Sequence, residues 1–421
     1  METARIFGLP AALLVLAFVA NRLSKLTRVP DLIVLLLMGV ALGPILHMVN
    51  PQMFKGAIHI LGMLALTLIL FEGGLELRLR QALRYFPAGL LLVVTSIGLS
   101  MGLIALIGRF LLHLDWLDCL LMGAALGCTS GAIVIPALQQ ISAPEAVKTT
   151  LTIEAALGEV IAVLIVGSML NLVPNQSVIT GLALDFSQNI VVAVIIGLVS
   201  ALIWSRLWPL AAPQPYSNVL NLGIVLGVFA VIRYAGGSSL LGELVFGITL
   251  ANMPLTPHAI RQGVRMLAFH SELSFLVRSF FFVMLGVVAE FVGRGHIIPI
   301  LGILAAIVLA RFAAAQLTRF AVRGVTGREA ELLFWMLPRG LVTAVLALEI
   351  VAARGMVFRF LPAVAFTVVL VSNLFIICGA IRSGRAPVVT HLPPDEVLAV
   401  EKVKSAVAGS GAAPTPAGTE Q

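Results

Sequence analysis

Long apolar runs separated by short polar segments dominate the pattern of this chain. One membrane crossing is assigned to each apolar run of roughly 17–25 residues, and thirteen spans are predicted before residue 385. This spacing predicts an all-α polytopic membrane protein. The approximate limits of the spans are 6–20, 30–48, 57–76, 86–110, 116–139, 151–173, 180–208, 217–234, 238–253, 268–290, 297–318, 330–352 and 359–381.

The basic residues between the spans predict the orientation of the chain. With the N-terminus outside, inside segments hold fifteen Lys and Arg residues and outside segments hold seven. Positive residues are retained on the cytoplasmic side of bacterial and eukaryotic membranes. We therefore expect an external N-terminus and a cytoplasmic C-terminus, in the cell (inner or plasma) membrane.

The composition supports this class and excludes several others. Hydrophobic residues make up 60% of the 421 residues and charged residues only 11%, against about 25% charged in a soluble domain. The net charge of +7 sits in short loops, so it does not predict nucleic-acid binding. Cys119, Cys128 and Cys378 lack CxxC spacing, and neither a disulfide framework nor a metal centre is indicated.

Two further segments complete the domain organisation. The first apolar run has no small-residue cleavage site and is expected to be a retained helix. Residues 386–421 end in "AVAGSGAAPTPAGTEQ", a composition that cannot bury a core and predicts a disordered cytoplasmic tail. The membrane domain is therefore assigned to residues 1–385, and the absence of a phosphate-binding glycine loop argues against an ATP-driven pump.

Charged residues inside the predicted spans are the candidate functional groups, because an ionised group is costly at bilayer depth and marks an ion or proton path by default. Glu243 and Glu349 lie toward span ends, where a side chain can reach the interface. Glu272 and Arg278 can satisfy one another or face the cytoplasmic mouth. The remaining four are Glu154, Glu159, Arg311 and Arg339.

Two of the spans contain helix-breaking residues. The fifth, "LLMGAALGCTSGAIVIPALQQ", contains three glycines, Pro136 and the polar pair Thr129-Ser130, and the twelfth, "FWMLPRGLVTAVLAL", contains Pro338, Arg339 and Gly340. Broken backbone at membrane depth is tolerated where neighbours or a cavity satisfy it. Ordinary helix kinks would explain either break alone. One break in each half favours an inverted-repeat transporter with its site at the midplane.

The chain resembles the monovalent cation:proton antiporters of the NhaP/NHE (sodium/proton exchanger) type. Seven segments carry the resemblance, occur in the family's order and cover nearly the whole membrane region. They are "FEGGLELRLR" (71–80), "TSGAIVIP" (129–136), "IEAALGEV" (153–160), "GGSSLLGELVFGITLAN" (236–252), "FFFVMLGV" (280–287), "LARF" (309–312) and "PRGLVTAVLAL" (338–348).

This resemblance implies a fold with NhaA-like inverted repeats and two broken helices that cross at the ion site. Residues 85–175 and 297–382 would form a mobile core, and residues 1–84 and 210–292 a scaffold that makes a homodimer. Residues 176–209 would be the linker helix between them. Exchange would occur by alternating access, as the core moves against the scaffold.

Geometry and resemblance together separate the two acids in "LTIEAALGEVIAVLIVGSML" (151–170). Five residues on a helix correspond to about 500°, so Glu154 and Glu159 point roughly 140° apart. The resemblance pairs Glu154 with Arg311, and a buried pair of this kind mainly fixes position. It places Glu159 where the family has the acid that binds both cation and proton. An acid satisfied by a neighbouring hydroxyl or backbone group is the structural alternative for Glu159.

The predicted ion site departs from the family's usual pattern in the residues around Glu159. Gly158-Glu159 stands where the family has Asn-Asp, and Ser130-Gly131 stands where it has Asp-Pro. Gly158 is expected to give Glu159 room. The predicted ion- and proton-binding residues are Glu159, Thr129, Ser130 and Gly158, with Arg339 as the charge at the broken helix and Glu72 as a further acid on the cytoplasmic side.

The function that follows is exchange of Na⁺, K⁺ or Li⁺ for H⁺, electroneutral if one acid carries one charge. The cation, with Glu159 as its ligand, and the proton are substrates, and no cofactor is expected. Two alternatives remain: a cation channel, which needs a symmetrical filter, and a transport-inactive homologue that acts as a sensor or scaffold. No nucleophile–base pair predicts an enzyme.

Overall fold

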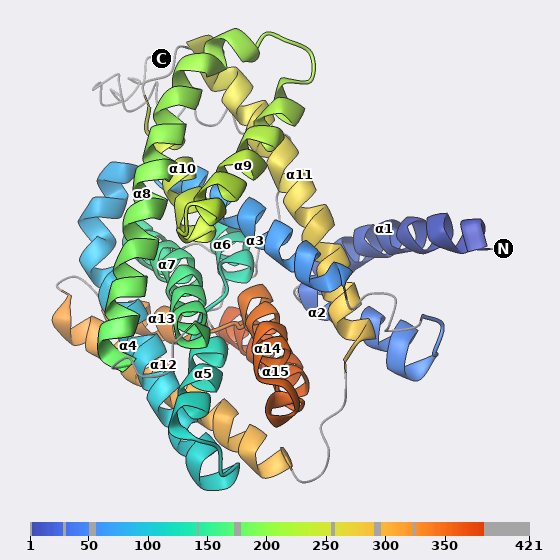
Figure 1. The fold of residues 1–421 in the computed structure, drawn as a ribbon, viewed down its shortest axis with the longest axis vertical. Helices are drawn as coiled ribbons and strands as arrows, with labels where there is room; N and C mark the ends of the chain where they lie inside the picture. Colours follow the sequence, from blue (N-terminus) through green and yellow to red (C-terminus); the bar gives the residue numbers. More distant parts are fainter. Residues whose placement is uncertain are drawn as a thin grey trace, which may run out of the picture.

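The computed structural model describes residues 2–27, 31–49, 56–140, 143–171, 178–253, 257–289, 296–322 and 326–382, and all of their regular structure is helical. The predicted tail, 386–421, lies outside these residues. The elements (Figure 1) are α1 (Glu2–Thr27), α2 (Asp31–Val40), the π-helix η1 (Ala41–Ile45), α3 (Ala57–Glu76), α4 (Leu79–Leu111), α5 (Trp116–Gly127), α6 (Gly131–Gln140), α7 (Glu145–Leu170), α8 (Val178–Ala211), α9 (Ser217–Tyr234), α10 (Ser239–Ala251), α11 (Pro257–Val287), α12 (Ile297–Ala321), α13 (Gly327–Trp335), α14 (Leu341–Arg354), the 3₁₀-helix η4 (Gly355–Phe358) and α15 (Leu361–Arg382).

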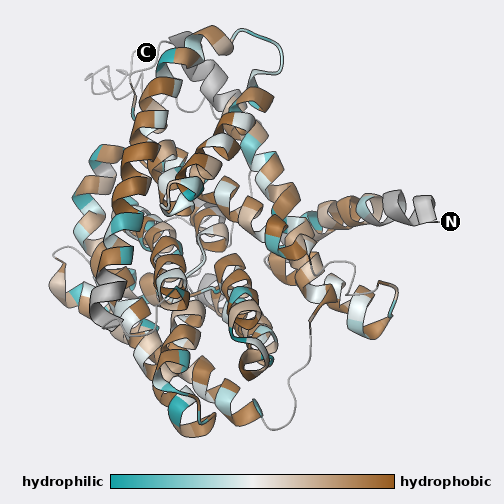
Figure 2. Ribbon diagram, viewed as in Figure 1, coloured by the Kyte–Doolittle hydropathy of each residue, from teal (hydrophilic) through white to brown (hydrophobic). Residues whose placement is uncertain are grey.

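The helices have the length and composition of membrane crossings. Within the described residues, ten are long and apolar enough to span a bilayer, and three shorter apolar helices cover Pro10–Leu23, Asp31–Ile45 and Ser239–Ala251. Apolar residues make up most of the helices (Figure 2), and large apolar side chains such as Val15, Phe110 and Leu210 are exposed, which suits contact with lipid chains. The chain is a multi-pass membrane protein; thirteen crossings in the strict sense remain a prediction.

The helices pack in two groups that share few contacts. In one group α3 lies along α10 and α11, α8 and α9 pack on α10, and α2 packs on α11. In the other group α4 lies against α5, α7 and α12, while α14 packs on α15, α5 and α7. The long helix α8 (Figure 1) packs on α10 and also contacts α7, so it touches both groups; their roles as scaffold and core remain a prediction.

Two glycines hold the first group together at its closest approach. A Cβ added at Gly74 on α3 would lie 2.6 Å from the carbonyl oxygen of Leu244 on α10, and the Cα atoms of Gly74 and Gly247 face each other across the crossing. Small residues allow such backbone contact between membrane helices, where van der Waals packing replaces the hydrophobic effect. The register of α10 on α3 is therefore fixed by the two backbones.

Two expectations for charged residues inside the predicted spans are wrong: the pairing of Glu272 with Arg278 and the interfacial position of Glu243. Arg278 does not pair with Glu272, which is exposed; it lies 3.3 Å from Asp31 on α2 and donates to the carbonyl of Ala132 on α6. Glu243 does not reach the interface, because its side chain is fully buried on α10. Tertiary packing decided both cases, and the partners of Arg278 lie 146 and 247 positions away in the sequence.

Candidate functional site

The two predicted breaks are present, and they meet. Residues 128–130 separate α5 from α6, and residues 336–340 separate α13 from α14. The backbone N–H of Ser130 donates to the carbonyl of Pro338 at 2.9 Å, which joins one extended segment to the other. Gly340 is required here, because a Cβ at this position would overlap the Ser130 hydroxyl. The crossing therefore exposes four helix ends to one another inside the protein.

Glu159 is a residue of α7, and its carboxylate lies at the N-terminal end of α6. Its Oε1 accepts the backbone N–H of Gly131 at 2.9 Å and the hydroxyl of Ser130 at 3.3 Å. Its side chain is fully buried. A carboxylate at a helix N-terminus is stabilised by the helix dipole and by the free N–H groups there.

The second carboxylate oxygen of Glu159 is free. Oε2 is buried and has no hydrogen-bond partner among the described residues. A buried polar atom without a partner is costly, and it needs either a proton or a positive ligand. Oε2 is therefore the atom of this crossing that is best placed to hold a proton or a monovalent cation.

The guanidinium of Arg339, from the break between α13 and α14, lies on the other side of the α5–α6 break, at the C-terminal end of α5. Its Nη1 donates to the carbonyl of Gly127, the last residue of α5, at 2.6 Å, and lies 3.4 Å from the Thr129 hydroxyl. Cations are favourable at a helix C-terminus for the same reason that anions are favourable at an N-terminus. The two ends of the break thus carry opposite charges, each matched to its dipole.

The backbone of Arg339 is held from α15. Its N–H donates to the hydroxyl of Ser372 at 2.9 Å, and its carbonyl accepts the side-chain amide of Asn373 at 2.9 Å. Ser100 on α4 contributes a longer contact, 3.5 Å, to the guanidinium. The sequence reasoning missed these three residues; their only signal was a polar side chain in an apolar span.

Glu154 and Arg311 form an ion pair on a different face of α7 from Glu159. Arg311 Nη1 lies 2.9 Å from Glu154 Oε1, and both side chains are fully buried. Arg311 also donates through Nε to the carbonyl of Leu333 at 2.7 Å and through Nη2 to the carbonyl of Met336. Arg311 therefore caps the C-terminal end of α13, and the ion pair ties that end to α7.

The structure separates the other predicted site residues. Thr129 faces Arg339 rather than Glu159. Gly158 faces α4, because a Cβ added there would lie 3.2 Å from Cγ2 of Val93; its small size permits close packing of α7 on α4. Glu72 lies on α3, where Ser271 of α11 donates to its carboxylate. Glu159 and Ser130 are thus the predicted ion ligands that the structure brings together.

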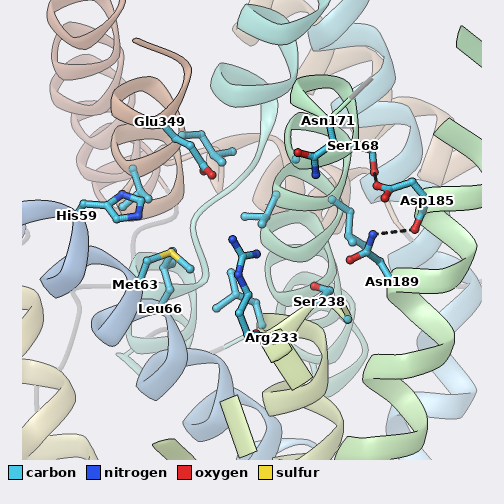
Figure 3. Close-up of a pocket in the computed structure, with 18 residues that line it drawn as sticks. His59, Met63, Leu66, Ser168, Asn171, Asp185, Asn189, Arg233, Ser238 and Glu349 are labelled. Atoms are coloured by element: carbon cyan, nitrogen blue, oxygen red, sulfur yellow. Dashed lines mark hydrogen bonds between the residues drawn. The ribbon is translucent and has the colours of Figure 1, made fainter. Parts of the chain in front are cut away.

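A pocket lies between the two helix groups, and Glu159 is not among the residues that line it. It has a volume of about 100 Å³, and its walls come from α3, α7, α8, α9, α10 and α14. Figure 3 shows Glu349 and Arg233 entering it from different walls, and the side-chain amide of Asn189 donating to the backbone carbonyl of Asp185 on α8. Val163, which lines the pocket, is one helical turn along α7 from Glu159. The pocket is therefore a candidate route for ions to the crossing.

Known proteins resemble the chain over almost its entire membrane region. The family model for the sodium/hydrogen exchanger transmembrane region matches residues 11–380. The K(+)/H(+) antiporter NhaP of Alkalimonas amylolytica is 26% identical over 413 residues, which cover 93% of this chain and 69% of that protein. The K(+)/H(+) antiporter NhaP2 of Shewanella sp. (strain ANA-3) is 26% identical over 201 residues, which cover 47% of this chain and only 35% of the relative.

A solved structure shows the same fold. The sodium proton antiporter MjNhaP1 of Methanocaldococcus jannaschii, determined at pH 8, superposes with a TM-score of 0.72 at 19% identity. The match covers 90% of this chain and 96% of that one.

Proposed function

Since the chain belongs to the sodium/hydrogen exchanger family, we propose that it exchanges Na⁺, K⁺ or Li⁺ for H⁺ across the membrane at Glu159. The observation that carries this assignment is the free, buried Oε2 of Glu159 at the helix crossing. The same carboxylate is anchored through Oε1, so its free oxygen is fixed in place.

Exchange would follow because either a proton or a cation, but not both, can bind Oε2 of Glu159. Removal of a carboxylate from water penalises its bare charge, so the group is occupied by a proton or paired with a cation. The two ligands compete for one negative charge and cannot bind together. A cycle that carries one cation in one direction and one proton in the other moves no net charge.

Alternating access would come from movement of one helix group against the other. The core would contain α4–α7 and α12–α15, and the scaffold α1–α3 and α9–α11, with α8 as the linker. The pocket of Figure 3 lies between the groups, on the side that the charge distribution of the loops places outside. It would be the external route when the core faces outward.

The scaffold would also form a homodimer in the cell membrane. It must stay fixed while the core moves, and a second copy would provide that support. The apolar side chains Leu14, Val15 and Phe18 are exposed on α1, which extends away from the rest of the molecule (Figure 1). We propose that this surface contributes to the dimer, with the N-terminus outside and the C-terminus in the cytoplasm.

The channel alternative lacks comparable support. A channel needs a continuous lining or filter, whereas the crossing is closed by the contacts of Ser130 with Pro338 and of Arg339 with Gly127. An inactive homologue would be consistent with the residues around Glu159 that differ from the family's pattern. An activity measurement separates these three functions.

The test is dissipation of an imposed pH gradient in proteoliposomes by Na⁺, K⁺ and Li⁺ in turn. An antiporter collapses the gradient only when a transported cation is present. A channel instead gives a voltage-dependent conductance, and an inactive homologue gives no response. Glu159→Gln should abolish the response while the protein remains folded. Glu145→Gln, which changes an exposed acid on the same helix, is the matched control and should leave exchange intact.

A further inference from the structure

Asn252, at the end of α10, joins three helix ends. Its Oδ1 accepts the backbone N–H of Leu79, the first residue of α4, at 2.7 Å. Its Nδ2 donates to the carbonyl of Leu77, just after α3, at 2.9 Å and to that of Ile248 on α10 at 2.7 Å. A side-chain amide offers one carbonyl oxygen and two N–H donors, and all of them are used here.

The orientation of this amide is fixed by its partners. Leu79 presents a donor, so the oxygen must face it, while Leu77 and Ile248 present acceptors, so the nitrogen must face them. Arg78, the N-cap residue of α4, makes no side-chain cap of its own. Asn252 thus supplies from another helix the cap that the start of α4 lacks.

The position of this contact is what gives it a function. Leu77 and Arg78 are the only non-helical residues between α3 and α4, and both have extended backbone. The helix before them packs on α10, and the helix after them packs on α5, α7 and α12. The two-residue junction therefore links the two helix groups directly.

The scaffold side of the junction is rigid. Gly74, three residues before Leu77, is in backbone contact with α10 at Leu244 and Gly247. Asn252 follows Gly247 by five residues, so this crossing sets the amide opposite the junction. Two of the segments that identify the family, 71–80 and 236–252, are thereby fastened to each other.

We propose that Asn252 is a positioning residue for transport, which pins the α3–α4 junction to the scaffold so that the core turns about Leu77 and Arg78. This inference rests on the proposed exchange function. A pivot must absorb changes in backbone angles at a few element-terminal residues, and a fixed anchor beside it confines those changes to one place. Without the amide, the start of α4 loses its cap and the turning point is no longer fixed.

Two variants separate the contribution of the Asn252 side-chain oxygen from that of its two N–H donors. Asn252→Asp keeps the oxygen that caps Leu79 and removes both donors, whereas Asn252→Leu keeps a similar volume and removes every hydrogen bond. The maximal exchange rate per folded protein in proteoliposomes should fall about tenfold in Asn252→Leu and less in Asn252→Asp. The Na⁺ concentration for half-maximal thermal stabilisation of purified protein should stay unchanged, because Glu159 is untouched. Ser205→Ala is the control, since among the described residues that hydroxyl donates only to the carbonyl of Leu202 in its own helix.

Hydrogen–deuterium exchange makes the test independent of activity. Residues 77–84 should exchange faster in Asn252→Leu than in the wild type, while residues 151–170 should not change. If the wild type shows no cation–proton exchange, the proposed function fails but faster labelling at 77–84 still supports the pinned junction. An unchanged transport rate in Asn252→Leu, or unchanged labelling at the junction, would overturn the inference.

Discussion

The carboxylate of Glu159 and the guanidinium of Arg339 lie on the two sides of the break between α5 and α6, and each has the charge that the adjacent helix end favours. The carboxylate accepts the N–H of Gly131 at the start of α6, and the guanidinium donates to the carbonyl of Gly127 at the end of α5. Protein groups thereby stabilise both helix ends at the break. This arrangement leaves Oε2 of Glu159 buried and without a hydrogen-bond partner among the described residues.

Shortening the acid should weaken cation binding. In Glu159→Asp the carboxylate withdraws by about 1.5 Å, the length of one C–C bond, and loses its contacts with Gly131 and Ser130. A hydrogen bond to a charged group contributes about 1.5–3 kcal/mol, so the half-saturating cation concentration should rise at least about tenfold. Titration of exchange with Na⁺ and K⁺ measures this change. Unaltered affinity would mean that the ion does not depend on the anchored carboxylate.

Gly158→Asn, which introduces the family's usual residue, should not restore cation binding in Glu159→Asp. Its Cβ would lie 3.2 Å from Val93, and forcing extra volume into a packed interface costs about 1–3 kcal/mol. Gly158→Asn should therefore lower the melting temperature, and Val93→Ala should recover part of the loss. The melting temperature of the detergent-solubilised protein, measured for both single variants and the double variant, tests this prediction.

The Glu154–Arg311 pair should be a positional element. Glu154→Gln leaves the buried guanidinium of Arg311 uncompensated, which costs about 3–5 kcal/mol of stability. The double variant with Arg311→Gln should be more stable than the sum of the two single changes predicts. Strictly additive losses in a double-mutant cycle would show that the two residues are not coupled.

The close contact between the two breaks can be tested by changing the side-chain volume at Gly340 and Ser130. Gly340→Ala introduces a Cβ that overlaps Ser130, so it should separate the extended segments and reduce both stability and exchange. Ser130→Gly removes the side chain that it meets, so the double variant should regain stability. Loss of the Ser130 hydroxyl removes only the longer of the two contacts to Glu159, so residual exchange is expected in that variant. A Gly340→Ala protein with normal stability would contradict the close crossing.

The proposed competition of proton and cation for Glu159 predicts how exchange depends on pH. A proton must leave the carboxylate before a cation binds, so apparent cation affinity should increase with pH. The half-saturating concentration should fall about tenfold per pH unit while the acid is mostly protonated, and it should become constant once the acid is mostly ionised. Rates measured with equal pH on both sides of the vesicle membrane test this. A half-saturating concentration independent of pH throughout would exclude a shared site.

Much of the fold could be predicted because its signals are local. Glycine, proline and polar residues at 127–136 and 338–343 mark both breaks without any knowledge of their partners. The helix limits were less accurate, since helices continue past their apolar runs: α4 begins at Leu79 and α11 at Pro257, well before the predicted 86 and 268. The length of an apolar run matches the thickness of the hydrocarbon core, whereas the helix itself continues into the interfacial region of the membrane.

The contacts of the site were harder to predict, because their partners are far apart in the chain. The pairing of Glu154 with Arg311 came from the resemblance. No sequence pattern indicated that Thr129 faces Arg339, that Ser100 reaches the same guanidinium 239 positions away, or that Asn252 bonds to Leu79. Glycine 158 was interpreted as space for a carboxylate, but the structure uses it for helix packing. These outcomes depend on rotation and register of helices, which composition does not specify.

The four helix ends at the crossing have a consequence for the energy of translocation. The counter-charges and caps of three of these ends, supplied by Glu159, Arg339 and Arg311, all come from the same group. When that group moves as one body, every one of these partners travels with it. The electrostatic self-energy of the site then stays nearly constant along the path, and the barrier to movement arises from the surfaces that slide past each other rather than from the ion.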